Sequence, residues 1–226
     1  AQAQARLRDV LVGLGLQQIM SYSFLAEGLL DLFDQDHAPN RVKLANPLTA
    51  DHTTMRDALL PQMAETIGLN FSRQVNEVAF FETGRVFTLG PDGLPTEEDH
   101  VAVGLSGPVG RTGLDKFKPV DELEMFLWIK GLWEQAAAAL NLRGAALRPA
   151  DRPWGEPGRG VESGVAGTAV GWLGLLKAEI AKAWRIHEPV GLLEAAVKPL
   201  VKDVAALQPL APPPSYPSIR RDAALI

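Results

Sequence analysis

Residues 42–87 read VKLANPLTADHTTMRDALLPQMAETIGLNFSRQVNEVAFFETGRVF, and the rest of the chain is organised around this stretch. It begins like a strand that must end at Asn46, because Pro47 disfavours helical angles in the residue before it. A helix follows, with Pro61 in the first turn, where a missing N–H leaves no hydrogen bond unmade. The apolar face of that helix is formed by Leu60, Met63, Ala64, Ile67 and Phe71.

The stretch ends in a strand predicted over residues 77–87, with apolar side chains on both faces, which is typical of a strand in the middle of a sheet. Glu82 and Arg85 point to opposite faces because side chains alternate along a strand. They could pair only if Gly84 introduced a bulge. Together with Arg56 they allow two interpretations. Either the charges are satisfied separately at the boundary of a layer, which we favour, or they form a polar floor for a carboxylate or phosphate ligand.

The flanking sequence predicts hairpins with helices between them. Helical spacing over residues 7–14 ends at Gly15, and residues 18–25 read as a strand with Met20, Tyr22 and Phe24 on one buried face. We expect an acidic loop over 88–100, further helices over 26–33, 122–141 and 177–184, and strands over 42–45, 101–106, 145–147, 168–173 and 191–197. Because strands and helices do not alternate regularly, the pattern indicates an α+β fold with a mainly antiparallel sheet flanked by helices.

The helix predicted over 122–141 contains an unbroken apolar run at 125–129. At about 100° per residue such a run goes round the whole helix, so we expect the helix to be covered on all sides by its own core or by another chain.

Composition narrows the class of function. The chain has 226 residues, 46% apolar and 22% charged, and a net charge of −5, which fits a globular domain and argues against a dedicated DNA- or RNA-binding domain. Without cysteine there is no disulfide, thiolate metal site or cysteine nucleophile, as suits a cytoplasmic protein. No apolar run approaches the roughly 20 residues of a membrane span. The polar start without Met shows no signal peptide and suggests a piece of a longer protein.

Other candidate sites are weak. The four histidines, at 37, 52, 100 and 187, have no metal-like spacing, and the acidic run at 97–100 is typical of a solvated loop tip. The glycine-rich pieces at 155–160 and 171–174 match no phosphate-binding motif, so turns and close strand packing explain them better. No serine stands in a nucleophile elbow.

Several motifs occur in an order that closely resembles the β subunit of bacterial phenylalanyl-tRNA synthetase. They are NPL at 46–48, MRDALLP at 55–61, NFSR at 70–73 and FETGRVF at 81–87, with LVGLGLQQ at 11–18, SYSF at 21–24, KG at 130–131, PGR at 157–159, GWLGL at 171–175 and YPSIRRD at 216–222. The chain departs from the family at Glu156, at residues 160–162, at Lys177 and within 125–131.

This resemblance implies a non-catalytic, class II synthetase-like core over residues 1–207, then a proline-rich linker and the start of an anticodon-binding domain over 208–226. It implies that the core scaffolds the catalytic α subunit in an α2β2 tetramer that charges tRNA(Phe) with phenylalanine. ATP and Mg²⁺ would belong to the holoenzyme and not to this piece. We expect the subunit interface to include Met125, Phe126, Trp128 and Trp133.

The distribution of Lys and Arg argues against a nucleotide-binding site. Residues 88–100 contain four acids and no Lys or Arg, and after the glycines at 171–174 the next arginine is Arg185, about two helical turns too far along. We therefore expect a structural core formed by Asn46, Pro47, Arg56, Glu82, Gly84 and Arg85. The alternatives are an active ATP-dependent small-molecule ligase that uses Arg56, Glu82 and Arg85, or an accessory tRNA-binding module.

Overall fold

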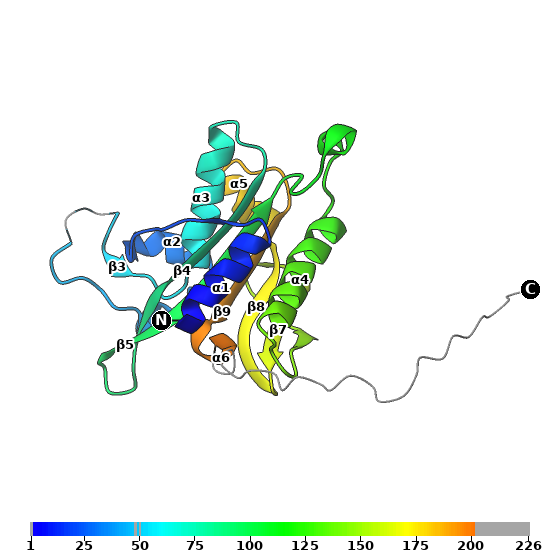
Figure 1. Cartoon of the computed structure of the whole chain (residues 1–226). Helices are drawn as coiled ribbons and strands as arrows, with labels where there is room; N and C mark the ends of the chain where they lie inside the picture. The colour runs from blue at the N-terminus through cyan, green and yellow to red at the C-terminus, as the bar shows by residue number, and fades with distance from the viewer. Residues whose placement is uncertain (1, 48, 50, 202–226) are drawn as a thin grey trace, which may run out of the picture.

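The computed structural model describes residues 2–47, 49 and 51–201 of the chain. In this part a seven-stranded, mainly antiparallel sheet lies between two layers of helices, as expected (Figure 1). The strand order is β1-β4-β5-β9-β8-β7-β6. The strands are β1 Gln17–Gln18, β4 Val78–Leu89, β5 Pro95–Ser106, β6 Ala146–Pro149, β7 Gly155–Val165, β8 Thr168–Leu176 and β9 Val190–Ala196.

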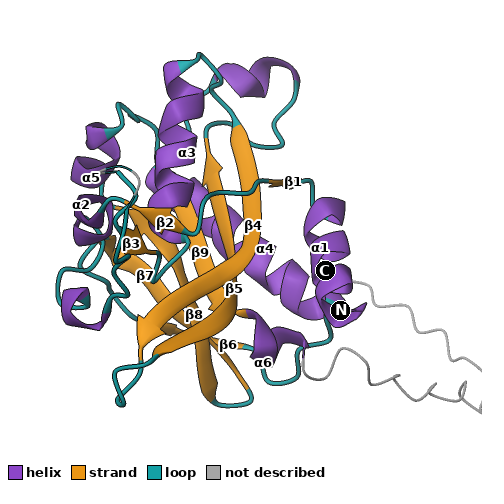
Figure 2. Ribbon diagram, turned by 90° about the vertical axis from the view of Figure 1, so that its left-hand side faces the viewer, coloured by secondary structure: helices purple, strands orange, loops and turns teal. Residues whose placement is uncertain are grey.

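Helices cover both faces of this sheet (Figure 2). On one face lie α1 (Gln2–Gly13), α4 (Glu122–Ala139) and α6 (Val197–Val201), and on the other lie α3 (Leu60–Ser72), α5 (Ala178–Ala183) and α2 (Glu27–Asp31). A small second sheet joins β2 (Phe24–Leu25) to β3 (Thr54–Met55), and two 3-10 turns, η1 and η2, span Ala38–Asn40 and Gly113–Phe117. None of the helices in the described residues is long and apolar enough to cross a membrane.

Each layer has its own apolar core. Phe81 lies with Met125 and Ile129 on the α4 face of the sheet, whereas Met63 and Ile67 lie on the α3 face. All five side chains are completely buried, and each stabilises the fold by about 1.5–3 kcal/mol relative to an exposed position. The predicted helix with a proline in its first turn is confirmed as α3.

The glycine-rich pieces build the far half of the sheet. Trp172 on β8 is buried on the α3 face and donates its indole N–H to the Ala150 carbonyl oxygen at 2.8 Å. A Cβ at Gly160 would lie 2.6 Å from the Ala150 carbonyl oxygen and 3.0 Å from this ring, and one at Gly174 would collide with the Arg159 carbonyl oxygen and lie 2.7 Å from the ring. Close packing against neighbouring backbone and one tryptophan therefore explains these two glycines, as the sequence indicated.

Three sequence predictions about strands are wrong. The buried strand over 18–25 does not form, since only its two ends pair and Met20 and Tyr22 are 91% and 69% exposed. The strand β4 is covered on both faces but is not central, because only the two-residue β1 lies outside it. The acidic loop is mostly strand: β4 continues to residue 89 and β5 begins at 95, so the acids at 97–99 lie on β5.

Of three further expectations, the strand over 42–45 is wrong, complete covering of the helix over 122–141 by its own chain is not found, and the end of the chain lies outside the described residues. Residues 42–45 form one isolated bridge, between Lys43 and Thr54, and no strand. The helix α4 is not covered all round by its own chain, because Leu127 is 52% exposed. The linker and next-domain prediction for 208–226 and the domain boundary at 207 lie beyond the described part.

Candidate functional site

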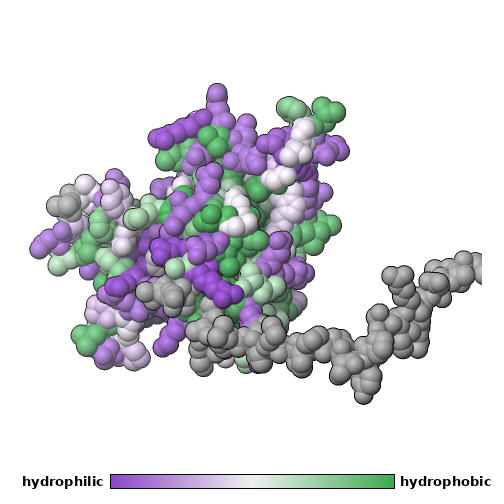
Figure 3. Space-filling model, in the orientation of Figure 1, coloured by the Kyte–Doolittle hydropathy of each residue, from purple (hydrophilic) through white to green (hydrophobic). Residues whose placement is uncertain are grey.

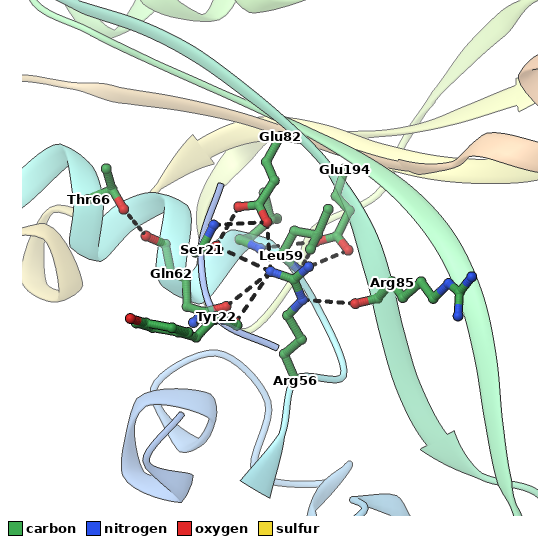
Figure 4. Close-up of polar contacts among 10 residues, drawn as sticks. Ser21, Tyr22, Arg56, Leu59, Gln62, Thr66, Glu82, Arg85 and Glu194 are labelled. Carbon is green, nitrogen blue, oxygen red and sulfur yellow. Dashed lines mark hydrogen bonds and ion pairs between the residues drawn. The ribbon is translucent and has the colours of Figure 1, made fainter. Parts of the chain in front are cut away.

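The charged residues singled out from the sequence lead to a buried ionic network on the α3 face of the sheet (Figure 4). Arg56 Nη1 lies 2.7 Å from Glu82 Oε1, and the two side chains are 4% and 1% exposed. Ser21 donates to the same carboxylate twice, from Oγ at 2.5 Å and from its backbone N–H at 3.3 Å. Arg56 Nε donates to the Arg85 carbonyl oxygen at 2.8 Å. The guanidinium therefore links β4 to the segment that precedes β2.

Local backbone geometry fixes Arg56 in this position. Its N–H donates to the Ser23 carbonyl at 3.0 Å, and its own carbonyl accepts from the Phe87 N–H at 2.8 Å. The guanidinium lies directly over Gly84, where any Cβ would collide with Nη2. The pairing of β4 with β5 runs through Gly84 without a shift, so there is no bulge, and Glu82 and Arg85 face opposite sides of the sheet as predicted.

Gln62, on the first turns of α3, completes the network. Its side-chain amide donates to the Tyr22 carbonyl at 2.8 Å, and its Oε1 accepts from Arg56 Nη1 at 3.4 Å. Buried charges are tolerated only when they are paired and hydrogen-bonded, and removal of one partner costs about 3–5 kcal/mol. The network is thus a strong structural constraint that joins β4, α3 and the segment before β2.

Arg85 does not belong to this network except through its backbone. Its side chain is 62% exposed and pairs with Glu97 at 2.7 Å and Asp99 at 3.6 Å. Figure 4 shows it pointing away from the guanidinium of Arg56. The three sequence-predicted charges therefore do not meet in one site, and the expectation that Arg85 belongs to a structural core is wrong.

Asn46 and Pro47 do not belong to that core either. Both are exposed in the loop between η1 and β3. The motif that they share with Leu48 is only partly visible, because residue 48 lies outside the described residues. Of the six predicted core positions, the structure places Arg56, Glu82 and Gly84 together.

A second polar cluster beside this network was missed in the sequence. Glu194 on β9 accepts from the Leu59 N–H with both oxygens at 3.0 Å and from the Leu60 N–H at 3.2 Å, so it caps the start of α3. His100 Nδ1 lies 2.7 Å from Glu194 Oε1, and His100 Nε2 lies 3.3 Å from Glu98 Oε2. Burial lowers the pKa of His100, but the two carboxylates outweigh it, and the net pKa is raised. The sequence feature that could have indicated this cluster is Glu194, the one acidic residue in the otherwise apolar strand β9.

The cavity next to His100 does not fit a nucleotide. It measures about 720 Å³, and its lining includes Asp57, Glu97, Glu98 and Asp99, with Lys198 as the one Lys or Arg among the described residues that line it. Burial raises the pKa of Asp57, and the Arg41 ion pair offsets this only in part. A triphosphate would meet repulsion along most of this wall. Among the described residues, no group of His, Asp or Glu is arranged to hold a metal ion.

The expected interface residues on α4 divide into two sets. Met125 and Trp133 are 0% and 3% exposed, so their side chains belong to the chain's own core and are not available to a partner. Phe126 and Trp128 are half-buried, and Leu127 between them is exposed. Leu127 and Trp128 line a groove of about 360 Å³. The groove is also lined by Leu14, Leu16, Ala79 and Leu105. Figure 3 shows apolar surface between α1 and α4 at this place.

Comparison with known proteins assigns the family. Residues 1–197 match the model of the phenylalanyl tRNA synthetase beta chain CLM domain. A phenylalanine--tRNA ligase beta subunit from Xanthomonas campestris pv. campestris is 35% identical over 223 residues, which are 97% of this chain and 27% of that protein. One from Xylella fastidiosa (strain 9a5c) is 32% identical over 225 residues, with the same coverage. The chain thus spans about a quarter of these relatives.

Solved structures agree on the fold. A pyrrolysyl-tRNA synthetase from Desulfitobacterium hafniense superposes with a TM-score of 0.68, covering 92% of this chain and 73% of its own, at 14% identity. A second structure of that synthetase gives a TM-score of 0.67, with 88% of this chain and 64% of its own covered. The class II synthetase fold expected from the sequence is therefore confirmed.

Proposed function

The chain belongs to the family of phenylalanyl-tRNA synthetase beta-chain CLM (catalytic-like) domains, and we propose that it is a non-catalytic scaffold for the catalytic α subunit. In this proposal the α subunit charges tRNA(Phe) with phenylalanine using ATP and Mg²⁺ in a cytoplasmic α2β2 enzyme. The chain supplies a folded surface, and it makes no contact with the nucleotide.

One observation supports the proposal most. The two arginines that could bind nucleotide phosphates, Arg56 and Arg85, are both paired with carboxylates. Arg56 is buried against Glu82, and Arg85 is held by Glu97 and Asp99 on the neighbouring strand. The face of the sheet near β8 is also occupied, since Trp154 packs edge-on against Trp172 at 4.3 Å between ring centroids. Within the described residues, Arg56 and Arg85 therefore already have carboxylate partners, and two tryptophan rings cover the face of the sheet near β8.

Lack of catalysis is tested by phenylalanine-dependent ATP–pyrophosphate exchange with the chain alone. We expect no turnover above background. Clear turnover that Arg85→Ala abolishes would overturn the proposal in favour of an active ligase. Saturable binding of ATP in calorimetry would point the same way.

The scaffold role is tested by co-elution of the chain with a phenylalanine--tRNA ligase α subunit. The apolar groove beside α4 is the proposed contact, since burying exposed apolar area drives association. Leu127→Asp places a charge in that groove and should abolish co-elution. Leu94→Asp is the matched control, because Leu94 is 62% exposed at the tip of the β4–β5 hairpin, away from the groove.

Transfer RNA is expected to reach this chain only through the assembled enzyme. The net charge is −5, so the chain alone lacks the basic surplus that phosphate contacts need. Tight tRNA binding by the chain alone, with a steep dependence on salt, would instead support an accessory tRNA-binding module.

A further inference from the structure

The start of α3 has no local cap. Its N-cap position is Leu59, an apolar residue that makes no side-chain hydrogen bond, and its first turn contains no acidic residue. A helix start leaves backbone N–H groups without partners inside the helix, and a Ser, Thr, Asp or Asn at the N-cap usually accepts from them. The N–H groups of Leu59 and Leu60 therefore need an acceptor from elsewhere in the chain.

That acceptor comes from the sheet. Glu194 lies on β9, 135 positions along the chain from Leu59, and both of its carboxylate oxygens accept from the Leu59 N–H. One of them also accepts from the Leu60 N–H. The Glu194 side chain is only 11% exposed, so the carboxylate depends on protein donors in place of water. Figure 4 shows it beside Leu59 at the start of the helix.

His100 is the remaining partner of this carboxylate. Its Nδ1 lies 2.7 Å from Glu194 Oε1, and its Nε2 lies 3.3 Å from Glu98 Oε2. An imidazole ring can donate from both nitrogens only when it is protonated. The ring therefore bridges the two carboxylates as a cation, whereas the neutral ring can donate to one of them at most.

Other charged groups lie near His100 without contacting its ring. Among the described residues, only those two carboxylates form a hydrogen bond or ion pair with it. The Arg56 guanidinium lies over Gly84, the partner of His100 on β4, but it is paired with Glu82. The charged or titratable residues that border the same cavities as His100 are Arg8, His37, Asp57, Arg85, Glu97, Asp99 and Lys198. Four of these are already in ion pairs, with one another or with Arg41.

The two contacting carboxylates therefore decide the protonation of the ring. Burial alone would lower the pKa of His100, but Glu194 and Glu98 raise it above the ordinary value of a histidine. That ordinary value is about 6.5.

We propose that Glu194 and His100 form a proton-dependent cap, in which the protonated ring holds the carboxylate against the start of α3 and loss of the proton loosens that start. The device goes beyond the scaffold role and does not depend on it. A hydrogen bond between an imidazolium and a carboxylate is charge-assisted and stronger than one from a neutral ring. After the proton has left, Glu98 and Glu194 face the ring with no cation between them, so Glu194 is held less firmly.

The direction of the effect follows from linkage. Because the pKa of His100 is raised in the folded chain, the cap is strongest at low pH and weakens as pH rises through the folded value. The attachment of α3 to the sheet is thus sensitive to pH above about 6.5.

The test is nuclear magnetic resonance on the full chain over a pH range that spans the titration of His100. Hydrogen exchange of the Leu59 and Leu60 amides, corrected for the intrinsic effect of pH, reports how often the start of α3 opens. We expect this opening to become about fivefold more frequent across the titration, since a charge-assisted bond is replaced by a neutral one. The ring signal of His100 gives the midpoint, which should lie above about 6.5.

The start of α4 is a control within the same molecule. It is capped locally by Asp121, which accepts from the Glu124 N–H at 2.8 Å, and no histidine among the described residues contacts this cap. Exchange of the Glu124 amide should show no such step. A step of equal size there would mean that the whole chain loosens with pH, and the inference would be wrong.

Three variants separate the roles of the side chains. His100→Gln keeps a neutral donor without titration, so the step should vanish. Glu98→Gln changes a residue outside the cap whose side chain is 57% exposed, and it should move the step to lower pH, because the ring loses one of its carboxylate neighbours. The matched control is His187→Gln, at an exposed histidine in the loop before β9, and it should change neither the size nor the midpoint of the step.

A step that persists in His100→Gln, or a midpoint that stays in place in Glu98→Gln, would overturn the inference. So would a His100 ring that titrates at or below about 6.5. If circular dichroism shows that His100→Gln does not fold, the wild-type titration and Glu98→Gln still decide the question. None of these outcomes bears on co-elution with the α subunit, so the scaffold proposal stands or falls separately.

Discussion

Removal of the Arg56 guanidinium should be among the most destabilising single changes in the chain. Arg56→Met leaves Glu82, which is 1% exposed on its side chain, as a buried carboxylate with only Ser21 as donor. It also removes the donor to the Arg85 carbonyl. An uncompensated buried charge of this kind costs about 3–5 kcal/mol. For comparison, the whole free energy of unfolding of a domain is about 5–15 kcal/mol.

The assay is equilibrium urea unfolding at neutral pH, followed by tryptophan fluorescence. The control is Arg85→Met, which makes the same substitution at an arginine whose side chain is 62% exposed and pairs with Glu97 on the surface. Surface ion pairs are worth about 0–1 kcal/mol, so the control should differ little from wild type. A loss below about 1 kcal/mol for Arg56→Met, or equal losses for both variants, would refute the reasoning that burial makes this pair structural.

Three further predictions concern packing and protonation. Gly84→Ala should cost about 1–3 kcal/mol by overpacking, because its Cβ would collide with the guanidinium of Arg56; urea unfolding measures it. Gly174→Ala should shift the fluorescence of Trp172 and lower the unfolding midpoint, since the new methyl group would collide with the Arg159 carbonyl oxygen and lie 2.7 Å from that ring. The pKa of His100 is raised by its carboxylate neighbours, so its contribution to stability is complete below its unfolded pKa and is lost as pH rises through the folded pKa. His100→Gln should flatten that decline, and a wild-type stability that does not change across this range would contradict it.

Local rules predicted what depends on neighbours in sequence. The proline entry to α3 follows from the chemistry of one residue, and the opposite orientation of Glu82 and Arg85 follows from the two-residue period of a strand. Long-range pairing could not be predicted in this way. The position of β4 near the edge of the sheet, and the contact of His100 with Glu194 across 94 residues, depend on how distant segments meet.

The failure at residues 18–25 has a different physical cause. Alternating apolar side chains predict a face that is covered, but the pattern does not state whether the cover comes from the same chain. Met20 and Tyr22 follow that pattern and are exposed. The same ambiguity applies to α4, where Met125 is buried and Leu127, two residues on, is not. In both places the pattern indicates apolar contact that the described residues do not supply.

Stability alone gives a weak account of the buried pair of Arg56 and Glu82. Replacing such a pair by apolar residues of similar volume is often neutral or stabilising, by about 1–4 kcal/mol. R56M/E82M should therefore recover most of the stability that Arg56→Met loses. Apolar side chains cannot, however, accept a hydrogen bond from the Ser21 hydroxyl, whereas Gln62 would still donate to the Tyr22 carbonyl at 2.8 Å. The double variant should accordingly regain stability although Ser21 loses the acceptor of its hydroxyl. A double variant that stays as unstable as Arg56→Met would show that the ion pair itself, and not the filling of this part of the core, stabilises the fold.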